Sequence, residues 1–459
     1  MDSLSEKRGN MSRRKFMGGF AATAATISIV PRHVLGGPGE TAPSDKLNVA
    51  CVGIGGKGFS DSEKMGTENV IALCDVDERQ ASELRGEEEK NAYTLYPRAK
   101  RYKDFRRMLE KEKEIEAITV STPDHTHAVI AMTAIQMGKH VFVQKPLTHT
   151  VQEARELASA AGKAGVVTQM GNQGHAGEGG RLICEWIWDG AIGDVKEVHI
   201  WTNRPIWPQN LTSPEEVPSV PASLDWNLWL GPAAWRPYHP TYVPFSWRGW
   251  WDFGTGALGD MGAHLIDHAY WPLKLKYPVS IHASSTEFTR DSPPMAEIIT
   301  YEFAARENMP PVTLTWYDGG LTPPRPAELE PGRRMGDGGG GLLFVGTKGK
   351  LMCGTYGRGP RLIPETFMKA YNRPEKTLKR SPGIHEEWIK ACKEGKPGLA
   401  TTNFDYSGPL TETMLLGNIA VRSKEHYKAL QYDGEKGEIT NLPEANEFMH
   451  MPYRDGWSL

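Results

Sequence analysis

The stretch Gly53-Ile54-Gly55-Gly56-Lys57-Gly58 decides the fold of the first half of this 459-residue chain. It follows the apolar run 47–52, which has the composition of a buried parallel strand, and it precedes a segment that can form a helix. Asp75 closes the next apolar run, 70–74. A glycine fingerprint alone is weak evidence, but strand, fingerprint, helix, strand and terminal acid together predict a dinucleotide-binding fold.

The residues of this fingerprint have separate physical tasks. Gly53 permits a tight turn, Gly55 lets the backbone approach a pyrophosphate, and Gly58 lets helix and strand pack closely. The helix N-terminus then faces the phosphates with its partial positive charge. Asp75 lies where a carboxylate accepts hydrogen bonds from the ribose hydroxyls and would repel a 2′-phosphate, which favours NAD, with NADP as the alternative. The residues assigned to the cofactor from this pattern are Gly53, Gly55, Gly56, Lys57, Gly58 and Asp75.

The N-terminal region has the character of a targeting segment. Residues 12–17, Ser-Arg-Arg-Lys-Phe-Met, open a mild apolar stretch that runs to about residue 30. The pattern resembles a twin-arginine export signal, and it is too short and too weakly apolar for a convincing membrane span. The alternative is a basic, disordered N-terminus. We predict an exported, periplasmic protein, a partner in the twin-arginine translocation machinery, and residues 1–44 as signal and linker.

Composition narrows the class of protein. Lys plus Arg is 53 and Asp plus Glu is 56, and no basic patch argues for nucleic acid or an anionic membrane surface as a partner. The five cysteines form no CxxC pair, and we interpret them mostly as small core residues. The length suggests two domains.

The first half of the chain alternates short apolar strands with helical stretches. This alternation predicts an α/β Rossmann domain, a doubly wound parallel sheet with helices on both faces, over residues 45–171. The expected strands are 47–53, 69–75, 115–122, 140–145 and 166–170, and the expected helices include 127–137 and 150–164.

The second half changes character near residues 169–174. Its strands alternate in polarity, which predicts an α+β domain, 172–459, with a large open, mostly antiparallel sheet covered by helices on one face. The expected strands are 195–202, 280–287, 297–303 and 312–316, with a hairpin of 342–345 and 350–353 around Gly346-Thr347-Lys348-Gly349 and helices at 384–393 and 409–424. We assign substrate binding and oligomerisation to this domain.

Two motifs carry candidate chemistry. Gln144-Lys145-Pro146 closes the strand at 140–143, on the edge of the sheet where such folds bind ligands. A lysine there can hydrogen-bond a substrate hydroxyl and stabilise negative charge on its oxygen, although it could equally be an ordinary surface lysine.

The second motif is a run of acid and histidine. If 258–271 is helical, then Asp260, His264 and His268 share one face. An imidazole can take the proton of an alcohol as hydride leaves its carbon, and Asp260 could orient the substrate. The alternatives are a helix cap at Asp260, a core role for His264, and a metal site that includes Asp267. Hydride transfer to nicotinamide needs no metal, and we predict none.

Eight of the 14 tryptophans lie between Trp201 and Trp251. Aromatic faces suit the C–H face of a pyranose, and neighbouring arginines can address its hydroxyls. The alternative is packing of a long loop or a subunit interface. We expect two or three of these tryptophans to touch substrate, and we assign Arg248 and Trp250 to this role. The density of aromatic side chains favours a glycoside or an oligosaccharide.

With these motifs in place, the chain resembles the Gfo/Idh/MocA family of sugar-acting NAD(P)-dependent oxidoreductases over essentially everything after residue 45. The family's Glu-Lys-Pro motif supplies an active-site lysine that matches Lys145, with Gln144 standing where the family has Glu. Its Asp and His four residues apart, which face the nicotinamide, match Asp260 and His264.

The resemblance implies further contacts. The family's Thr-Pro with a nearby His matches Thr122, Pro123 and His127, and residues 171–173 resemble its interdomain crossover, which adds Gln173. The spacing of His125 and His127 suggests a metal site, but a helix start capped by Asp124 near the ribose is the preferred interpretation. A homo-oligomer formed through the open sheet is an expectation from the family.

Together these features predict hydride transfer between nicotinamide and a sugar hydroxyl, with His264 as base, Lys145 as electrostatic partner and Asp260 as orienter. An exported enzyme has no evident pool to reoxidise NADH, so it should hold its cofactor tightly and restore it in its own cycle. It could oxidise one sugar and reduce another. It could also cleave a glycosidic bond through a transient keto-sugar, with no net redox change. A non-catalytic sugar-binding protein is the third alternative.

Overall fold

The parallel sheet predicted for the first half of the chain is confirmed. The computed structural model describes residues 45–85 and 89–459, and the predicted export signal lies outside them. Within this part of the chain the strands of the first sheet are β1 (Asn48–Val52), β2 (Asn69–Cys74), β3 (Lys100–Tyr102), β4 (Ala117–Val120), β5 (His140–Gln144) and β6 (Thr168–Gly171). They pair in parallel in the order β3-β2-β1-β4-β5-β6.

Helices connect these strands, and local sequence explains where they begin and end. They are α3 (Lys57–Lys64), α4 (Glu78–Ser82), α5 (Ala92–Leu95), α6 (Phe105–Lys111), α7 (Asp124–Gln136) and α8 (Val151–Ala164). At the start of α8, Thr150 Oγ1 accepts from the Glu153 amide, and the Glu153 carboxylate accepts from the Thr150 amide. The helix ends at Gly165, which adopts the left-handed conformation at φ 66°.

The order of the strands reverses between β1 and β4. In an open parallel sheet, this reversal creates a crevice outside the carboxyl ends of the strands, where ligands bind. The glycine stretch that follows β1 and Thr122, which follows β4, both lie at this point. The topology therefore brings the predicted cofactor residues to one edge of the sheet.

The second sheet is mostly antiparallel, as predicted. Among the described residues its order is β13-β12-β11-β7-β10-β9-β8-β14-β15, with one parallel pair, β7 and β10. The strands are β7 (Val195–Thr202), β8 (Ser280–Ser285), β9 (Glu297–Phe303), β10 (Val312–Tyr317), β11 (Gly340–Gly346), β12 (Lys350–Gly354), β13 (Arg361–Ile363), β14 (Leu430–Asp433) and β15 (Glu438–Ile439). The predicted hairpin joins β11 to β12.

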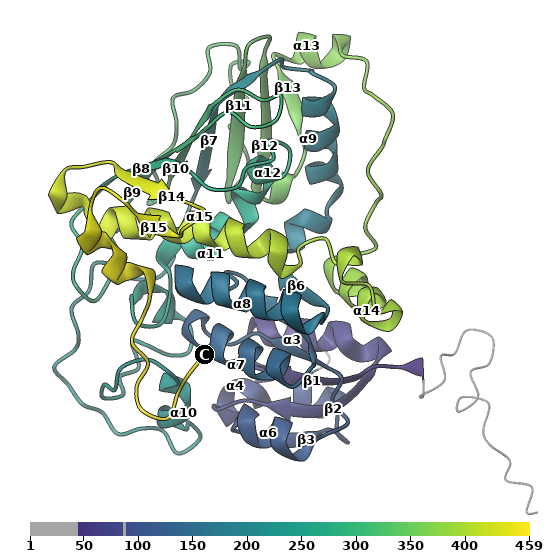
Figure 1. The fold of residues 1–459 in the computed structure, drawn as a ribbon, viewed down its shortest axis with the longest axis vertical. Helices are drawn as coiled ribbons and strands as arrows, with labels where there is room; N and C mark the ends of the chain where they lie inside the picture. The colour runs from purple at the N-terminus through teal and green to yellow at the C-terminus, as the bar shows by residue number, and fades with distance from the viewer. Residues whose placement is uncertain (1–44, 86–88) are drawn as a thin grey trace, which may run out of the picture. The chain divides into compact units, whose positions relative to one another are not determined.

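The helices of this half pack on both sheets. They are α9 (Glu178–Trp188), α10 (Trp226–Leu230), α11 (Gly256–Leu265), α12 (Asp267–Tyr270), α13 (Glu365–Ala370), α14 (Ile384–Glu394) and α15 (Phe404–Arg422). In Figure 1, α15 runs alongside α8, and it contacts both α8 and α11. Trp388 of α14 packs edge-on against Phe142 of the first sheet, so the second half of the chain covers a face of the first.

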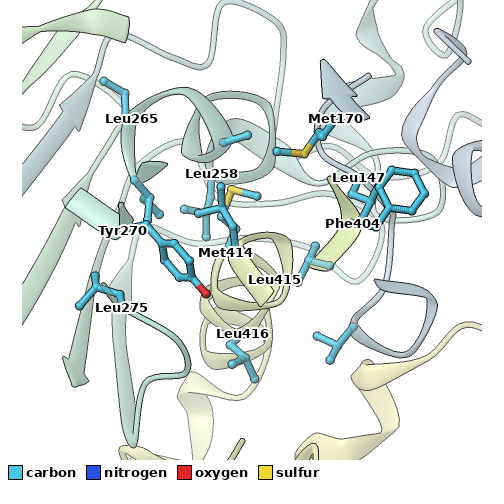
Figure 2. Packing of buried hydrophobic residues seen from close by; sticks show 14 of the residues in the cluster. Leu147, Met170, Leu258, Leu265, Tyr270, Leu275, Phe404, Met414, Leu415 and Leu416 are labelled. Carbon is cyan, nitrogen blue, oxygen red and sulfur yellow. The ribbon is translucent and has the colours of Figure 1, made fainter. Parts of the chain in front are cut away.

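Residues 47–459 form one compact unit. The division into domains 45–171 and 172–459 therefore stays a prediction. Figure 2 shows part of the shared core, where Leu258 of α11 and Met414 of α15 lie in the same cluster as Leu147 and Met170. This continuous core fixes the second half of the chain against the edge of the parallel sheet where the cofactor residues gather.

Three predictions about elements were wrong in detail. The helix predicted at 409–424 begins at Phe404, because the Asn403 side chain caps it and Pro409 is accommodated inside it. The helix predicted at 258–271 is interrupted between α11 and α12. Strand β3 was not predicted because its sequence, Lys-Arg-Tyr, is an exposed edge without an apolar run.

Two further findings concern composition. All five cysteines are buried and unpaired. Across residues 45–85 and 89–459, no helix has the length and apolar character needed to cross a membrane.

Candidate active site

The glycine stretch has the close packing that its sequence predicts. A Cβ atom at Gly58 would lie 1.8 Å from the Gly53 carbonyl oxygen, and one at Gly55 would lie 2.9 Å from Gln80 Cβ. Gly53 itself adopts a positive φ of 74°. Side chains at Gly55 and Gly58 would clash with neighbouring parts of the chain, so glycine allows the tight turn that leaves backbone amides free to approach a phosphate group. The loop therefore fits a dinucleotide.

Asp75 follows β2 at the same edge. Its carboxylate accepts hydrogen bonds from the Ile54 amide at 2.8 Å and from the Asp77 amide at 2.9 Å. Burial raises the pKa of Asp75 to about 6, although these amides favour the ionised form. The side chain is thus held beside the glycine loop, where it can accept hydrogen bonds from ribose hydroxyls.

A cavity of about 600 Å³ lies along this edge and extends between the two halves of the chain. It brings together nearly all the residues predicted from the sequence. Those that line it are Gly53, Gly55, Gly56, Lys57, Asp75, Thr122, Pro123, Lys145, Gln173, Arg248, Asp260 and His264.

An ion pair forms the centre of the cavity wall. Lys145 Nζ donates to Asp260 Oδ1 at 2.9 Å and to the Asp260 carbonyl at 2.7 Å. Arg248 Nε donates to the same carboxylate oxygen at 3.2 Å. Burial alone would raise the pKa of Asp260, but the two cations hold it well below its usual range. Asp260 is therefore ionised and keeps Lys145 in place. It lies inside α11 and does not cap this helix.

His264 lies one helical turn further along α11. Its Nδ1 is 3.1 Å from the Asn172 side-chain oxygen, and with the ring proton on Nδ1 donated to this oxygen, Nε2 keeps its lone pair. Tyr356 packs edge-on against the imidazole at 4.8 Å between ring centroids. Burial and the neighbouring Lys145 hold the pKa of His264 well below its usual value, so the ring is neutral.

Three of the predicted binding residues, Gly58, His127 and Trp250, do not line the cavity. Gly58 packs against the Gly53 carbonyl within the glycine stretch. His127 is buried between the carbonyl groups of Pro146, 2.9 Å from Nδ1, and Thr122, 2.8 Å from Nε2. It ties the turn after Lys145 to the turn after β4, so it positions the cofactor residues without lining their cavity. Trp250 is 1% exposed and packs in an aromatic cluster with Tyr242, so it supports the loop.

The prediction that His268 shares one helix face with Asp260 and His264 is also wrong. Eight residues of a helix turn through about 800°, so His268 points roughly 80° away from Asp260. It does not line the cavity, and its ring lies against Gly174 and Gly180, where added Cβ atoms would lie 3.0 and 3.1 Å from its ring nitrogens. Among the described residues, no three His, Cys, Asp or Glu side chains are arranged to hold a metal ion.

Asp124 is the main residue whose environment the sequence did not reveal. It does not cap α7 as predicted; instead its Oδ2 accepts from the Thr255 hydroxyl at 2.7 Å, and it lines the cavity. Burial raises the pKa of Asp124 to about 7, against the pull of Thr255, Arg248 and Lys145. The neighbouring His125 lies between the backbone carbonyls of Trp229 and Phe253, and its ring also packs against the rings of these two residues.

The structure explains why position 144 is glutamine and not glutamate. Its Nε2 donates to the buried Asp61 carboxylate at 2.7 Å. The Asp61 carboxylate also accepts a hydrogen bond from Ser121 Oγ at 2.9 Å, and it forms ion pairs with Lys57 and His385. Burial opposes ionisation of Asp61, but His385 and Lys57 hold its pKa below the usual value. A glutamate at position 144 would place a second negative charge beside this carboxylate.

The outer part of the cavity is aromatic and cationic. Trp207, Trp229 and Trp247 contribute to its lining, and Arg204 lies 3.9 Å from Asp260 Oδ2. Tyr356 also lines it and has left-handed backbone angles, φ 61° and ψ 24°, which are uncommon for a residue with a side chain. Asp337 holds this turn by accepting from the Thr355 amide at 3.0 Å. Neither Tyr356 nor Asp337 belonged to a recognised motif.

The fold and this cavity define the class of protein, a nicotinamide-dinucleotide oxidoreductase. Sequence models of one oxidoreductase family match residues 47–172, as its NAD-binding Rossmann fold, and residues 200–308, as its C-terminal alpha/beta domain. The two matches together span about half of the chain. The chain belongs to the Gfo/Idh/MocA family, and its first half is an NAD-binding domain.

Curated relatives share limited parts of the sequence. The chain is 27% identical to scyllo-inositol 2-dehydrogenase (NADP(+)) IolW of Bacillus subtilis over 48% of this chain and 51% of the relative. It is 26% identical to levoglucosan dehydrogenase of Pseudarthrobacter phenanthrenivorans, over 36% and 35%. It is also 26% identical to a glycosyl hydrolase family 109 protein of Shewanella, over 38% and 39%. The chain thus spans about a third to a half of the length of these relatives.

Solved structures confirm the fold. Levoglucosan dehydrogenase in complex with NADH superposes with a TM-score of 0.54 at 19% identity, covering 84% of this chain and 99% of that chain. The WlbA dehydrogenase from Bordetella pertussis, in complex with NADH and UDP-GlcNAcA, gives a TM-score of 0.56 at 16% identity, with the same coverage.

Proposed function

We propose that the protein transfers hydride between NAD and a secondary hydroxyl of a sugar or glycoside. The observation that carries the proposal is the convergence of Lys145, Asp260 and His264 on the cavity that begins at the glycine loop. A sugar-binding protein without turnover would have no use for a neutral imidazole beside a cation. Such a protein is therefore disfavoured.

The substrate class follows from the outer lining. Trp207 and Trp247 line the cavity, and their apolar rings suit the C–H side of a pyranose, whereas the guanidinium groups of Arg204 and Arg248 can donate to its hydroxyls. The named relatives act on polyols and sugars, which supports the same substrate class here.

The roles of the residues follow from their protonation. Bound NAD supplies the acceptor for the hydride that leaves the carbinol carbon. His264 Nε2, which keeps its lone pair, takes the hydroxyl proton. The Lys145 ammonium stabilises negative charge on the same oxygen, and Asp260 keeps this ammonium charged and oriented. In the reverse direction the proton returns from His264 to the oxygen.

A second function is redox-neutral cleavage of a glycosidic bond, and Asp124 is the observation that favours it. Oxidation of a ring hydroxyl acidifies the neighbouring C–H, and a base takes this proton as the glycosidic C–O bond breaks. An acid protonates the departing oxygen, water adds to the resulting double bond, and the hydride returns to the oxidised carbon. A buried carboxyl with a pKa of about 7 is protonated in a large share of molecules at neutral pH and can supply this proton. The glycosyl hydrolase family 109 relatives support the same alternative.

Export and tight retention of the cofactor remain part of the proposal. A fusion of residues 1–44 to a reporter tests export, and replacement of both Arg13 and Arg14 by lysine should abolish it. Oligomerisation through the second sheet is tested by light scattering of the purified protein.

The test of the chemistry uses protein purified without added cofactor and a panel of glycosides. Substrate mass and nicotinamide absorbance are followed together. A product two hydrogens lighter, with stoichiometric NADH, supports oxidoreduction. Release of aglycone over many turnovers without lasting NADH supports bond cleavage. Absence of both across the panel, with sugar binding retained, would contradict the enzyme and support a sugar-binding protein.

A further inference from the structure

A small apolar pocket adjoins the main cavity at the carboxyl ends of β1, β2 and β4. It shares Gly53, Asp75, Thr122, Pro123 and Trp229 with that cavity. The rest of its lining is largely apolar and includes Val52, Cys74, Val76, Ile130, Leu228 and Trp457. Asp75, which can hold the ribose, lies in both cavities, so adenine is the adjoining planar group of the dinucleotide that can lie against this pocket of about 50 Å³.

A segment of the second half of the chain closes one side of this pocket. The Asp225 amide donates to the Val76 carbonyl at 2.9 Å, and the Glu78 amide donates to the Ser223 carbonyl at 3.1 Å. These bonds fasten the start of α10 to the residues that follow β2. Leu228 and Trp229 of α10 are thereby held in the pocket wall.

The C-terminal segment 450–459 closes another side. Arg454 Nη1 donates to Asn227 Oδ1 of α10 at 2.7 Å, and the Arg454 amide donates to the Pro232 carbonyl at 3.1 Å. In Figure 1 this yellow segment runs past α10 and ends beside α7. The segment therefore fastens to the same helix that already covers the pocket.

Trp457 is the side chain that this segment delivers to the pocket. Its ring lies 6.2 Å from the Phe105 ring, and the Arg106 guanidinium lies 4.5 Å above it. These contacts hold the indole in the pocket wall. The family matches end at residue 308, so they do not assign any role to this segment.

We propose that segment 450–459 completes the adenosine end of the NAD site, with Trp457 as the wall for the base and Arg454 as the anchor. The inference rests on the proposed function, and it deepens that function by naming the segment that would retain the cofactor through turnover. Release of NAD requires the segment to detach from α10, so the segment slows dissociation.

The test compares full-length variants freed of nucleotide, with binding of NAD, ADP and nicotinamide mononucleotide measured by calorimetry. Trp457→Ala should lower the affinities for NAD and ADP by about 5- to 100-fold, the range for loss of a base–aromatic contact. The affinity for nicotinamide mononucleotide should stay within about twofold of the wild-type value. Trp457→Phe should restore most of the affinity. The matched control is Trp235→Ala, because Trp235 is 69% exposed and lines neither pocket.

A second variant tests the anchor. Arg454→Ala should speed dissociation of NAD in a stopped-flow competition experiment. It should also lower the affinity for ADP and leave the affinity for nicotinamide mononucleotide unchanged. Unchanged affinity for ADP in Trp457→Ala would overturn the proposal, as would equal losses for ADP and nicotinamide mononucleotide. These measurements need no sugar, so a protein that fails to oxidise any glycoside but loses ADP selectively would refute the proposed function and leave this inference standing.

Discussion

Asp260 in α11 and Asp124 at the start of α7 line the same cavity, yet their protonation differs. Asp260 contacts Lys145 at 2.9 Å and Arg248 at 3.2 Å, and these cations hold its pKa well below the usual range. Asp124 accepts a hydrogen bond from the neutral Thr255 hydroxyl, and burial raises its pKa to about 7. The contacts of each carboxyl, and not the residue type, set its chemistry.

This difference separates two tasks. The ionised Asp260 can organise a cation for the redox step. The protonated Asp124 can provide a proton for bond cleavage. The comparison can therefore be tested by changing one environment at a time.

Removal of the cation beside Asp260 should have the largest effect. Lys145→Met leaves the carboxylate with Arg248 and the more distant Arg204, and it removes the ammonium group proposed to stabilise the reacting oxygen. We expect the single-turnover rate to fall by about 10²- to 10³-fold, with little change in KM. Lys163→Met, at an exposed position of α8, is the matched control. A loss below tenfold would mean that Lys145 is structural.

Neutralisation of Asp124 should affect bond cleavage more than oxidation. Below about pH 7 the carboxyl is protonated and can donate, so aglycone release should decline by up to tenfold per unit as the pH rises above 7. Asp124→Asn should lower this rate about 10²-fold and remove that limb of the pH profile. An unchanged profile in the variant would exclude Asp124 as the acid.

A charge added next to Asp61 should cost stability. Gln144→Glu replaces the donor that lies 2.7 Å from the Asp61 carboxylate with a like charge. We expect a loss of about 1–3 kcal/mol in the free energy of unfolding. Repulsion raises the folded-state pKa of the introduced carboxyl, so the loss should be smallest in acid and should grow as the pH rises above about 4.

The check on this effect is a double-mutant cycle by denaturant unfolding. Combination with Asp61→Asn should recover part of the loss, because only one carboxylate then remains. Additive losses in the double variant would show that the two positions do not interact.

The smallest effect concerns cofactor affinity in acid. Protonation of Asp75 below about pH 6 removes an acceptor for the ribose hydroxyls, so affinity for NAD should fall by at most tenfold per pH unit below that value. Asp75→Asn should bind NAD more weakly at neutral pH and lose this dependence. Calorimetric titration between pH 5 and about pH 8 gives both results. A wild-type affinity that stays constant over this range would contradict the assignment.

Local signals in the sequence were sufficient for much of the fold and the cofactor loop. The apolar strand before Gly53 and the acid after the next strand are encoded within one βαβ unit, where short-range patterns decide the structure. The spacing of Asp260 and His264 likewise follows from a single helix.

The remaining features depend on contacts between distant segments. Asp124 owes its environment to Thr255, 131 residues away in sequence. Nothing near Trp250 indicates that it faces the loop core, whereas Trp207 faces the cavity. Trp457 reaches the pocket only because the C-terminal segment returns to α10, which no local pattern predicts.

The most direct test of the central claim follows the hydride itself. Glycosides deuterated at single secondary carbons are mixed with the protein and stopped during the first turnover, and the bound nicotinamide is analysed by mass spectrometry. We predict deuterium in the nicotinamide for one labelled carbon, and its absence in Lys145→Met and His264→Ala over the same time. Formation of product with no deuterium in the nicotinamide from any labelled carbon would contradict the account.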